Sequence, residues 1–240
     1  MVLTTYGYVG GITSLAIVTL SYLCCAIFLA RYAISQRIET LLQGIVFFAI
    51  GSNWLGVLIS FLNVLRGGEP LAHVPMIRTW SWAPAATATI WIYQVLLLIR
   101  PKLKTAVGSI YFVLDVIYIY LMYFQTVNYT RVELVGGLPD SIILGIAIVF
   151  LLFYILTALI IIGPLYLVFV GFRSERPETQ LKGKVIGIGV MLFAFFALFD
   201  TIIPPSVELL TFARIIILIA ILLMYLGFTL PTWFRQRFLG

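Results

Sequence analysis

The stretch "LFDTIIPPSVELLTFARI", residues 198–215, decides how the end of the chain folds. Its double proline cannot continue a helix, but proline is well tolerated where a new helix begins. We therefore expect one helix to end near residue 203 and another to begin near 209. Ser206 is the expected N-cap of this second helix, and Glu208 lies in the first turn of the same helix, near the positive end of its dipole. Arg214 lies about one and a half turns further in, which returns it to the depth of Asp200. The spacing predicts an Asp200–Arg214 ion pair.

Charged residues in so apolar a segment need an explanation. An arginine at the centre of a bilayer costs about 2.5–3.5 kcal/mol on insertion scales, so a partner is expected. In a structural interpretation, the pair pins two helices together. In a functional interpretation, Arg214 binds an anionic group in a ligand or ion site just below the outer surface. In a third, Arg214 has no partner and its head reaches toward the membrane interface.

The whole chain is far more apolar than a soluble domain. Of its 240 residues, 62% are hydrophobic and 10% are charged, so its surroundings are expected to be lipid. Backbone polar groups in lipid must be satisfied internally, which favours helices. The first apolar stretch has neither a basic start nor a small-residue cleavage site, so we do not interpret it as a removable signal peptide.

Seven apolar runs are long enough to cross a bilayer. They cover approximately residues 8–33, 40–65, 82–98, 105–124, 141–172, 185–203 and 209–230. The sequence therefore predicts an all-α membrane protein, a single seven-transmembrane-helix bundle over residues 1–240.

Basic residues gather on one side of this predicted bundle, and the positive-inside rule places that side in the cytoplasm. With an odd number of spans, the C-terminus is cytoplasmic and the N-terminus lies outside, in a multi-pass protein of the cell membrane. The net charge of +6 therefore reflects topology and does not indicate nucleic-acid binding; anionic lipid headgroups are the expected partners. The cytoplasmic set is Arg31, Arg37, Arg100, Lys102, Lys104, Arg173, Arg176, Lys182, Lys184, Arg235 and Arg237, against Arg66, Arg78 and Arg131 on the other side.

Asp115 is unexpected because it lies near the middle of the fourth predicted span. Tyr111 at i−4 and Tyr118 at i+3 share its helix face. The candidate hydrogen-bond partners are Asn53 on the second span, at comparable depth, and Gln94 on the third, whose depth matches less well. Such a cluster is either an interhelical clasp or a site of proton coupling or ligand binding. Three aromatic residues could line the same interior, although their spacing is more typical of packing: Trp54, Trp91 and Tyr93. The candidate ligand- or ion-site residues are thus Asp115, Asn53, Trp91, Gln94, Asp200 and Arg214.

The sequence carries no enzyme signature. Its single histidine, His73, lies in a predicted outer loop, so no haem ligand or serine–histidine pair is expected inside the bundle. Zinc-type ligand clusters are absent from the sequence, and no lysine lies within a span where a retinal Schiff base would need one. Asp115 and Asp200 fall at different depths, which argues against an aspartyl dyad. We therefore expect no catalytic activity, no metal and no cofactor.

Two loops carry further expectations. The outer loop, residues 66–81, mixes glycine, proline and aromatic residues, which indicates a structured lid or an interfacial segment. The inner stretch, residues 172–184, is charged and contains a proline, so we expect it to be solvated and mobile.

The ending "ARIIILIAILLMYLGFTLPTWFRQRF", residues 213–238, is an apolar helix with glycine and proline near its inner end, followed by a basic exit. This segment and the predicted topology resemble the seven-helix sensor regions of prokaryotic, especially archaeal, histidine kinases and related receptor-like proteins. The resemblance implies a protein that senses an external or lipid-phase signal and passes it inward. No kinase, HAMP or cyclase domain follows, so output is expected to need a partner protein that meets residues 172–184 and the tail.

Two other functions fit the same topology. Sugar transporters and PQ-loop proteins are built as three-plus-one-plus-three repeats. Here the first span lacks a proline while the fifth contains Pro164, and the two triplets show no convincing similarity, which weakens a transporter or channel interpretation. An accessory subunit of a larger membrane complex would use its polar intramembrane residues to contact other chains. A second copy of the chain is a further candidate partner.

Overall fold

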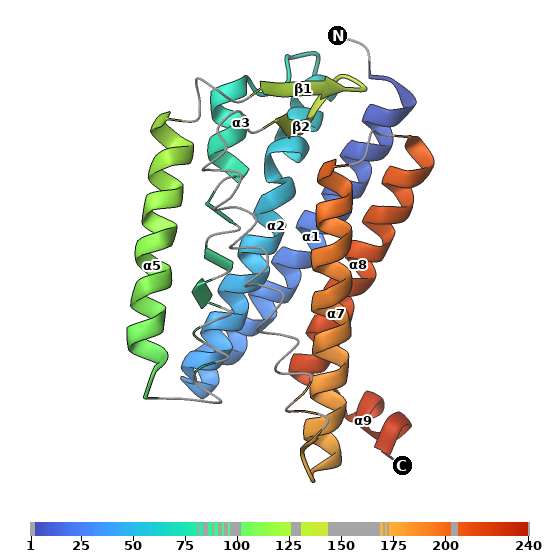
Figure 1. Ribbon diagram of the computed structural model, residues 1–240. Coiled ribbons are helices and arrows are strands. Elements are labelled where there is room, and N and C mark those ends of the chain that lie inside the picture. Colours follow the sequence, from blue (N-terminus) through green and yellow to red (C-terminus); the bar gives the residue numbers. More distant parts are fainter. Residues whose placement is uncertain are drawn as a thin grey trace.

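The computed structural model of the protein (Figure 1) describes residues 3–80, 82–83, 86–87, 89–90, 93, 96, 102–125, 131–143, 169, 171, 173–202 and 206–239. Most of the predicted spans 82–98 and 141–172 lie outside these residues. The candidate site residues Trp91 and Gln94 also lie outside them.

Long helices dominate the described part of the chain. Four of them are long and apolar enough to cross a membrane: α1 (Thr5–Ser35), α2 (Ile38–Leu65), α7 (Pro177–Ile202) and α8 (Val207–Thr229). A fifth, α5 (Lys104–Tyr120), is apolar but shorter, and the π-helical turn η1 (Leu121–Gln125) extends it. The described residues therefore form a predominantly α-helical membrane protein, as the composition predicts. The count of seven spans and the orientation remain predictions.

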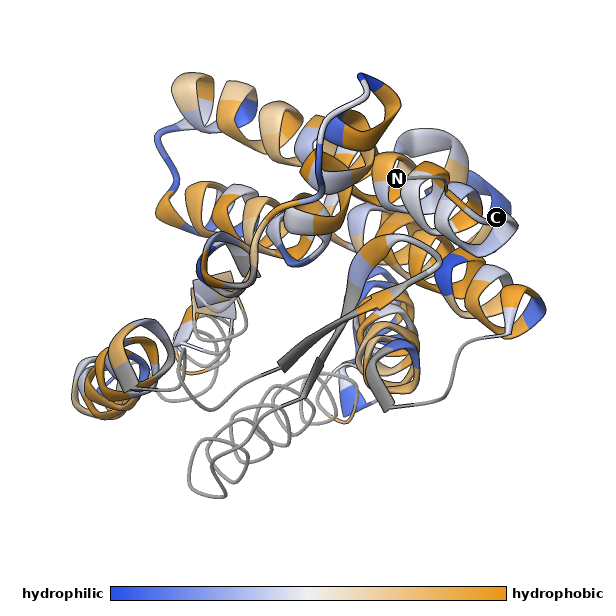
Figure 2. Ribbon diagram, turned by 90° about the horizontal axis from the view of Figure 1, so that it is seen from above, coloured by the Kyte–Doolittle hydropathy of each residue, from blue (hydrophilic) through white to orange (hydrophobic). Residues whose placement is uncertain are grey.

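The surfaces of these helices are suited to lipid. Figure 2 shows hydrophobic residues along the outward sides of the long helices as well as between them. Large apolar side chains that a soluble protein would bury are exposed, among them Ile12 on α1, Phe112 on α5 and Phe195 on α7, each more than half exposed. Apolar groups at such positions are stable against hydrocarbon and would aggregate in water.

The core is built where α1, α2, α7 and α8 meet. The helices α1 and α2 form an antiparallel pair, with Phe28 and Phe47 stacked at a centroid separation of 5.5 Å. Ile217 on α8 is fully buried in the same cluster, and Val190 brings in α7. Gln36 adopts a left-handed conformation (φ 53°) that ends α1 and lets the chain reverse into α2.

One end of the bundle carries the N-terminus, the short helix α3 (His73–Trp80) and a two-stranded antiparallel sheet, β1 (Arg131–Val135) and β2 (Leu138–Ile143) (Figure 1). We call it the hairpin end. Gly136 and Gly137 both have positive φ, and they form the two-residue turn between the strands. The Thr4 N–H donates to the Gly136 carbonyl at 3.2 Å, which fixes the turn to the start of α1.

This end both confirms and corrects the sequence predictions. The predicted outer loop 66–81 is structured, since α3 lies within it and Met76 is buried with Val57 and Leu138. The start of the predicted fifth span is wrong, because residues 141–143 belong to β2. The glycine pair Gly136–Gly137 is a turn signal, but the long apolar run that follows it is more typical of a membrane span.

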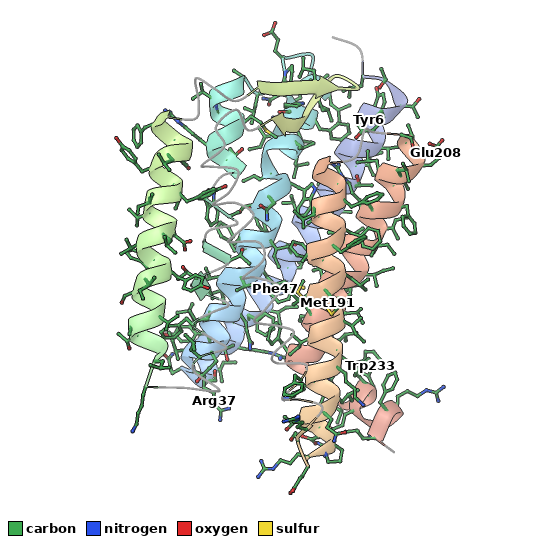
Figure 3. All side chains as sticks on the ribbon, viewed as in Figure 1. Tyr6, Arg37, Phe47, Met191, Glu208 and Trp233 are labelled. Carbon is green, nitrogen blue, oxygen red and sulfur yellow. The ribbon has the colours of Figure 1, made fainter. Side chains whose placement is uncertain are left out.

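The opposite end carries the turn between α1 and α2 and the C-terminal helix α9 (Thr232–Leu239), and we call it the tail end. In Figure 3, Tyr6 and Glu208 lie at the hairpin end, and Arg37 and Trp233 lie at the tail end. The expectation that residues 172–184 form a mobile loop is wrong from Pro177 onward, where α7 begins. Proline suits the first turn of a helix because its missing N–H has no partner there.

Candidate functional site

Arg214 lies on the second turn of α8, and its side chain is only 1% exposed. Its Nε donates to both carboxylate oxygens of Asp200, at 3.2 Å to Oδ1 and 3.3 Å to Oδ2. Asp200 comes from the last turns of α7, and its side chain is 10% exposed. The predicted ion pair is confirmed. The predicted N-cap is confirmed as well, since the Ser206 hydroxyl accepts from the Leu209 N–H at 3.2 Å.

The guanidinium also reaches α1. Its Nη1 donates to the Gly10 carbonyl at 2.8 Å, to Ser14 Oγ at 2.9 Å and to Thr13 Oγ1 at 3.3 Å. The Thr13 hydroxyl donates to the Val9 carbonyl at 2.7 Å, which leaves its oxygen free to accept from the arginine. Sequence reasoning missed these partners. The signal was present, because adjacent hydroxyl residues near the start of an apolar helix are natural acceptors for a buried cation.

Trp54 on α2 adds a fourth helix to the site. Its indole Nε1 donates to Asp200 Oδ2 at 3.3 Å, and its ring packs edge-on against Phe193 at 6.1 Å. The sequence placed Trp54 beside Asp115, whereas in the structure it contacts Asp200. We call Arg214, Asp200, Trp54, Gly10, Thr13 and Ser14 the Arg214 network.

The geometry of the Arg214 network favours a structural role. Hydrogen bonds from Arg214 and Trp54 join α8 to α7 and α1, and α7 to α2. A guanidinium removed from water is stable only when a counter-charge and acceptors surround it, and here one carboxylate and three α1 oxygens do so. The network therefore links four helices, α1, α2, α7 and α8, through side-chain hydrogen bonds.

Asp115 lies on α5, away from this network (Figure 1). Its Oδ2 accepts a hydrogen bond from the Thr89 hydroxyl. Asp115, Tyr111 and Tyr118 are all buried, as expected of residues that share one helix face. Within the described residues, Asn53 is not bonded to Asp115 as predicted: its Nδ2 donates to the carbonyls of its own helix, 3.3 Å from both Ala49 O and Ile50 O. These backbone carbonyls, three and four residues back, accept from the amide in place of a side chain on another helix.

The bonding of Asp115 is incomplete. Among the residues that the structure describes, its Oδ1 has no hydrogen-bond partner, and neither does the Tyr118 hydroxyl. The side chain of Asp115 is 5% exposed and that of Tyr118 is fully buried. Buried polar atoms are nearly always hydrogen-bonded, so two unpartnered atoms on one helix face are unusual. We call Asp115, Thr89, Tyr111 and Tyr118 the Asp115 cluster.

Within the described residues, no group of three or more His, Cys, Asp or Glu side chains is arranged to hold a metal ion. Neither a protein-family model nor a curated protein matches the sequence, so the functional argument depends on the geometry of the chain itself.

Proposed function

We propose that the chain is an integral membrane protein of the sensor or receptor type, which passes a structural change along α7 and α8 to a partner protein at its cytoplasmic face. The observation that carries this proposal is the Arg214 network. It ties the hairpin ends of α7 and α8 to α1 and α2, while the opposite end of α8 continues into α9.

The orientation in this proposal has the hairpin end outside and the tail end in the cytoplasm. The two chain termini lie at opposite ends of the bundle (Figure 1), which is what an odd number of spans requires. Positive charge at the tail end supports the cytoplasmic assignment. Arg37 in the α1–α2 turn and Arg235 in α9 both lie there.

The α7–α8 pair is suited to carry a change from one end to the other because the two helices approach closely along their length. A Cβ atom added at Gly189 would lie 3.0 Å from the Ala220 carbonyl oxygen, and one added at Gly227 would lie 3.0 Å from the Ile186 nitrogen. Helices in such close contact move together, since packed interfaces shift between discrete arrangements and do not deform continuously.

At the tail end, an ion pair joins α7 to α9, the helix that follows α8 in the chain. Arg235 Nε on α9 contacts Glu178 Oε1 on the first turn of α7 at 2.7 Å. Both side chains are about half exposed, so water weakens this pair and a partner can replace it. In this proposal, the buried Arg214 network holds the extracellular ends of α7 and α8 in place, and the exposed Arg235–Glu178 pair can rearrange at the cytoplasmic end. A signalling protein needs such a stable end together with an end that a partner can change.

The test is chemical labelling at the tail end after the network is altered. A reporter cysteine replaces Trp233, which is 62% exposed on α9, in the otherwise unchanged chain, whose Cys24 and Cys25 are buried. We expect Asp200→Asn to change the labelling rate at position 233 severalfold. A matched reporter, Ile34→Cys on the tail end of α1 (87% exposed), should label at the same rate in both backgrounds.

An unchanged rate at position 233 in a folded Asp200→Asn protein would contradict the proposal, because the hairpin end would then have no influence on α9. Equal changes at positions 34 and 233 would also contradict it, since they would indicate general loosening and not movement of α7 and α8.

A further inference from the structure

The Asp115 cluster is a second intramembrane polar site, and its interpretation does not depend on the function proposed above. At 1.5 Å per residue, Asp115 lies about 16 Å along α5 from Lys104, close to the middle of a hydrocarbon core about 30 Å thick. The outward face of α5 is apolar, with Phe112 and Val116 exposed on it. The carboxyl group is therefore directed toward the protein, where water is scarce.

The described residues give this carboxyl group one hydrogen-bond donor and no counter-charge. Thr89 donates to Oδ2, while Oδ1 has no partner. No salt bridge to Asp115 occurs within the described residues. The arginine on α3, Arg78, lies over the ring of Tyr123 with its guanidinium carbon 5.9 Å from the ring centroid, beyond the end of α5.

The hydrogen-bond partners and the counter-charge that the cluster lacks indicate the chemistry of a ligand that would fit it. Asp115 Oδ1 needs a donor, the Tyr118 hydroxyl needs a partner of either kind, and a carboxylate in hydrocarbon needs a positive charge. The rings of Tyr111 and Tyr118 lie one turn to either side of Asp115 on the same face. Aromatic faces attract cations, most strongly where water is excluded.

We propose that the Asp115 cluster is a binding site for a protonated amine. The ammonium group of the ligand donates to Asp115 Oδ1 and to the Tyr118 oxygen, and Thr89 holds the carboxylate in place through Oδ2. A neutral alcohol would supply hydrogen bonds but no charge. A calcium ion takes six to eight oxygen ligands, whereas the side chains of the cluster carry fewer: two carboxylate oxygens on Asp115 and one hydroxyl each on Thr89, Tyr111 and Tyr118.

The experiment uses the full chain in detergent micelles or nanodiscs and measures its unfolding temperature against probe concentration. The probe is benzylammonium chloride. Benzyl alcohol, which has nearly the same shape without the charge, and sodium chloride at equal ionic strength serve as comparators. We expect a saturable rise in unfolding temperature with benzylammonium only.

Three variants then locate the site. Asp115→Asn keeps the size of the side chain and the Thr89 bond, and should weaken benzylammonium binding roughly tenfold or more, the usual effect of losing a hydrogen bond to a charged group. Tyr118→Phe should weaken it severalfold. Tyr22→Phe is the matched control, because the Tyr22 hydroxyl pairs with Ser52 at 3.2 Å between α1 and α2, and it should leave the affinity unchanged.

Three results would overturn the proposal: no saturable response to benzylammonium, an equal response to benzyl alcohol, or wild-type affinity in Asp115→Asn. If Asp115→Asn does not fold, Tyr118→Phe decides, and wild-type affinity in that variant rejects the site.

Discussion

Among the described residues, two carboxylates with little exposure lie in apolar helices, Asp200 on α7 and Asp115 on α5, and their surroundings are opposite. Asp200 has a charged partner and an indole donor, and through Arg214 it is linked to three oxygens of α1. Asp115 has a single donor, Thr89, and one oxygen without a partner among the described residues. The composition of the two segments is similarly apolar, so the difference arises from which polar groups neighbouring helices bring to each carboxylate.

This comparison separates a structural site from a binding site. Removing one partner of a satisfied buried ion pair strongly destabilises the fold. Replacing a buried polar group that has no partner changes the free energy of unfolding little, because that group is already costly in the folded protein. Stability should therefore depend on the Arg214 network, and ligand binding should depend on the Asp115 cluster. The substitutions below test that separation, from the largest expected effect to the smallest.

Arg214→Ala should have the largest effect. It leaves Asp200 buried without its counter-charge, and we expect a loss of about 3–5 kcal/mol in the free energy of unfolding. Reversible unfolding in mixed micelles measures it. Arg235→Ala is the control, because its exposed pair with Glu178 should contribute at most about 1 kcal/mol. Similar losses for the two variants would remove the distinction between the buried and exposed pairs.

Trp54→Phe should come second. The ring is kept, so the contact with Phe193 is largely retained, while the hydrogen bond to Asp200 is lost. The expected loss is about 1.5–3 kcal/mol, the range for hydrogen bonds to charged groups. Trp233→Phe at an exposed position should change the same unfolding free energy by less than about 0.5 kcal/mol. If Trp54→Phe is equally silent, Trp54 does not belong to the network.

Two tyrosine variants should differ in sign. Tyr22→Phe removes a hydroxyl that bonds to Ser52, and we expect a loss of about 0.6 kcal/mol, the average for such interhelical bonds in membranes. Tyr118→Phe removes a buried hydroxyl with no described partner, and stability should stay constant or rise. Parallel unfolding curves of the two variants measure the contrast. A clear loss in Tyr118→Phe would show that its hydroxyl is satisfied in the folded protein.

The smallest effect is expected at Asn53, whose amide bonds only to carbonyls of its own helix in the described structure. Asn53→Ala should change the unfolding free energy by about 0.5 kcal/mol or less. In a double-mutant cycle with Asp115→Asn, the two changes should add to within about 0.5 kcal/mol. A larger coupling would restore the predicted Asn53–Asp115 partnership.

Much of the Arg214 network could be predicted because its signals are local. The double proline sets the turn, Ser206 caps α8, and the helical rise brings Arg214 back to the depth of Asp200. The contributions of Trp54 and of the Gly10 carbonyl could not be predicted, since they depend on how α1 and α2 are rotated against α7 and α8. Apolar helices that are hydrophobic on all sides give little sign of that rotation.

The fold shows the same division between local and non-local signals. Composition and run length identified the long helices with boundaries correct to within a few residues, except at the start of α7. There the charges of residues 172–184 suggested a loop, although Pro177 is a favoured helix start. For Asp115, the sequence correctly identified Tyr111 and Tyr118 on one face. It missed Thr89, because a threonine in an apolar segment is too common to mark a partner.

The most direct test of the account is one substitution made at two places, Asp200→Asn and Asp115→Asn, with unfolding free energies compared in the same micelles. The charge removed is the same, so the surroundings alone decide the outcome. The account predicts a loss of at least about 2 kcal/mol for Asp200→Asn and a change of about 1 kcal/mol or less for Asp115→Asn. Equal losses, or a larger loss at Asp115, would contradict the assignment of structure to one site and binding to the other.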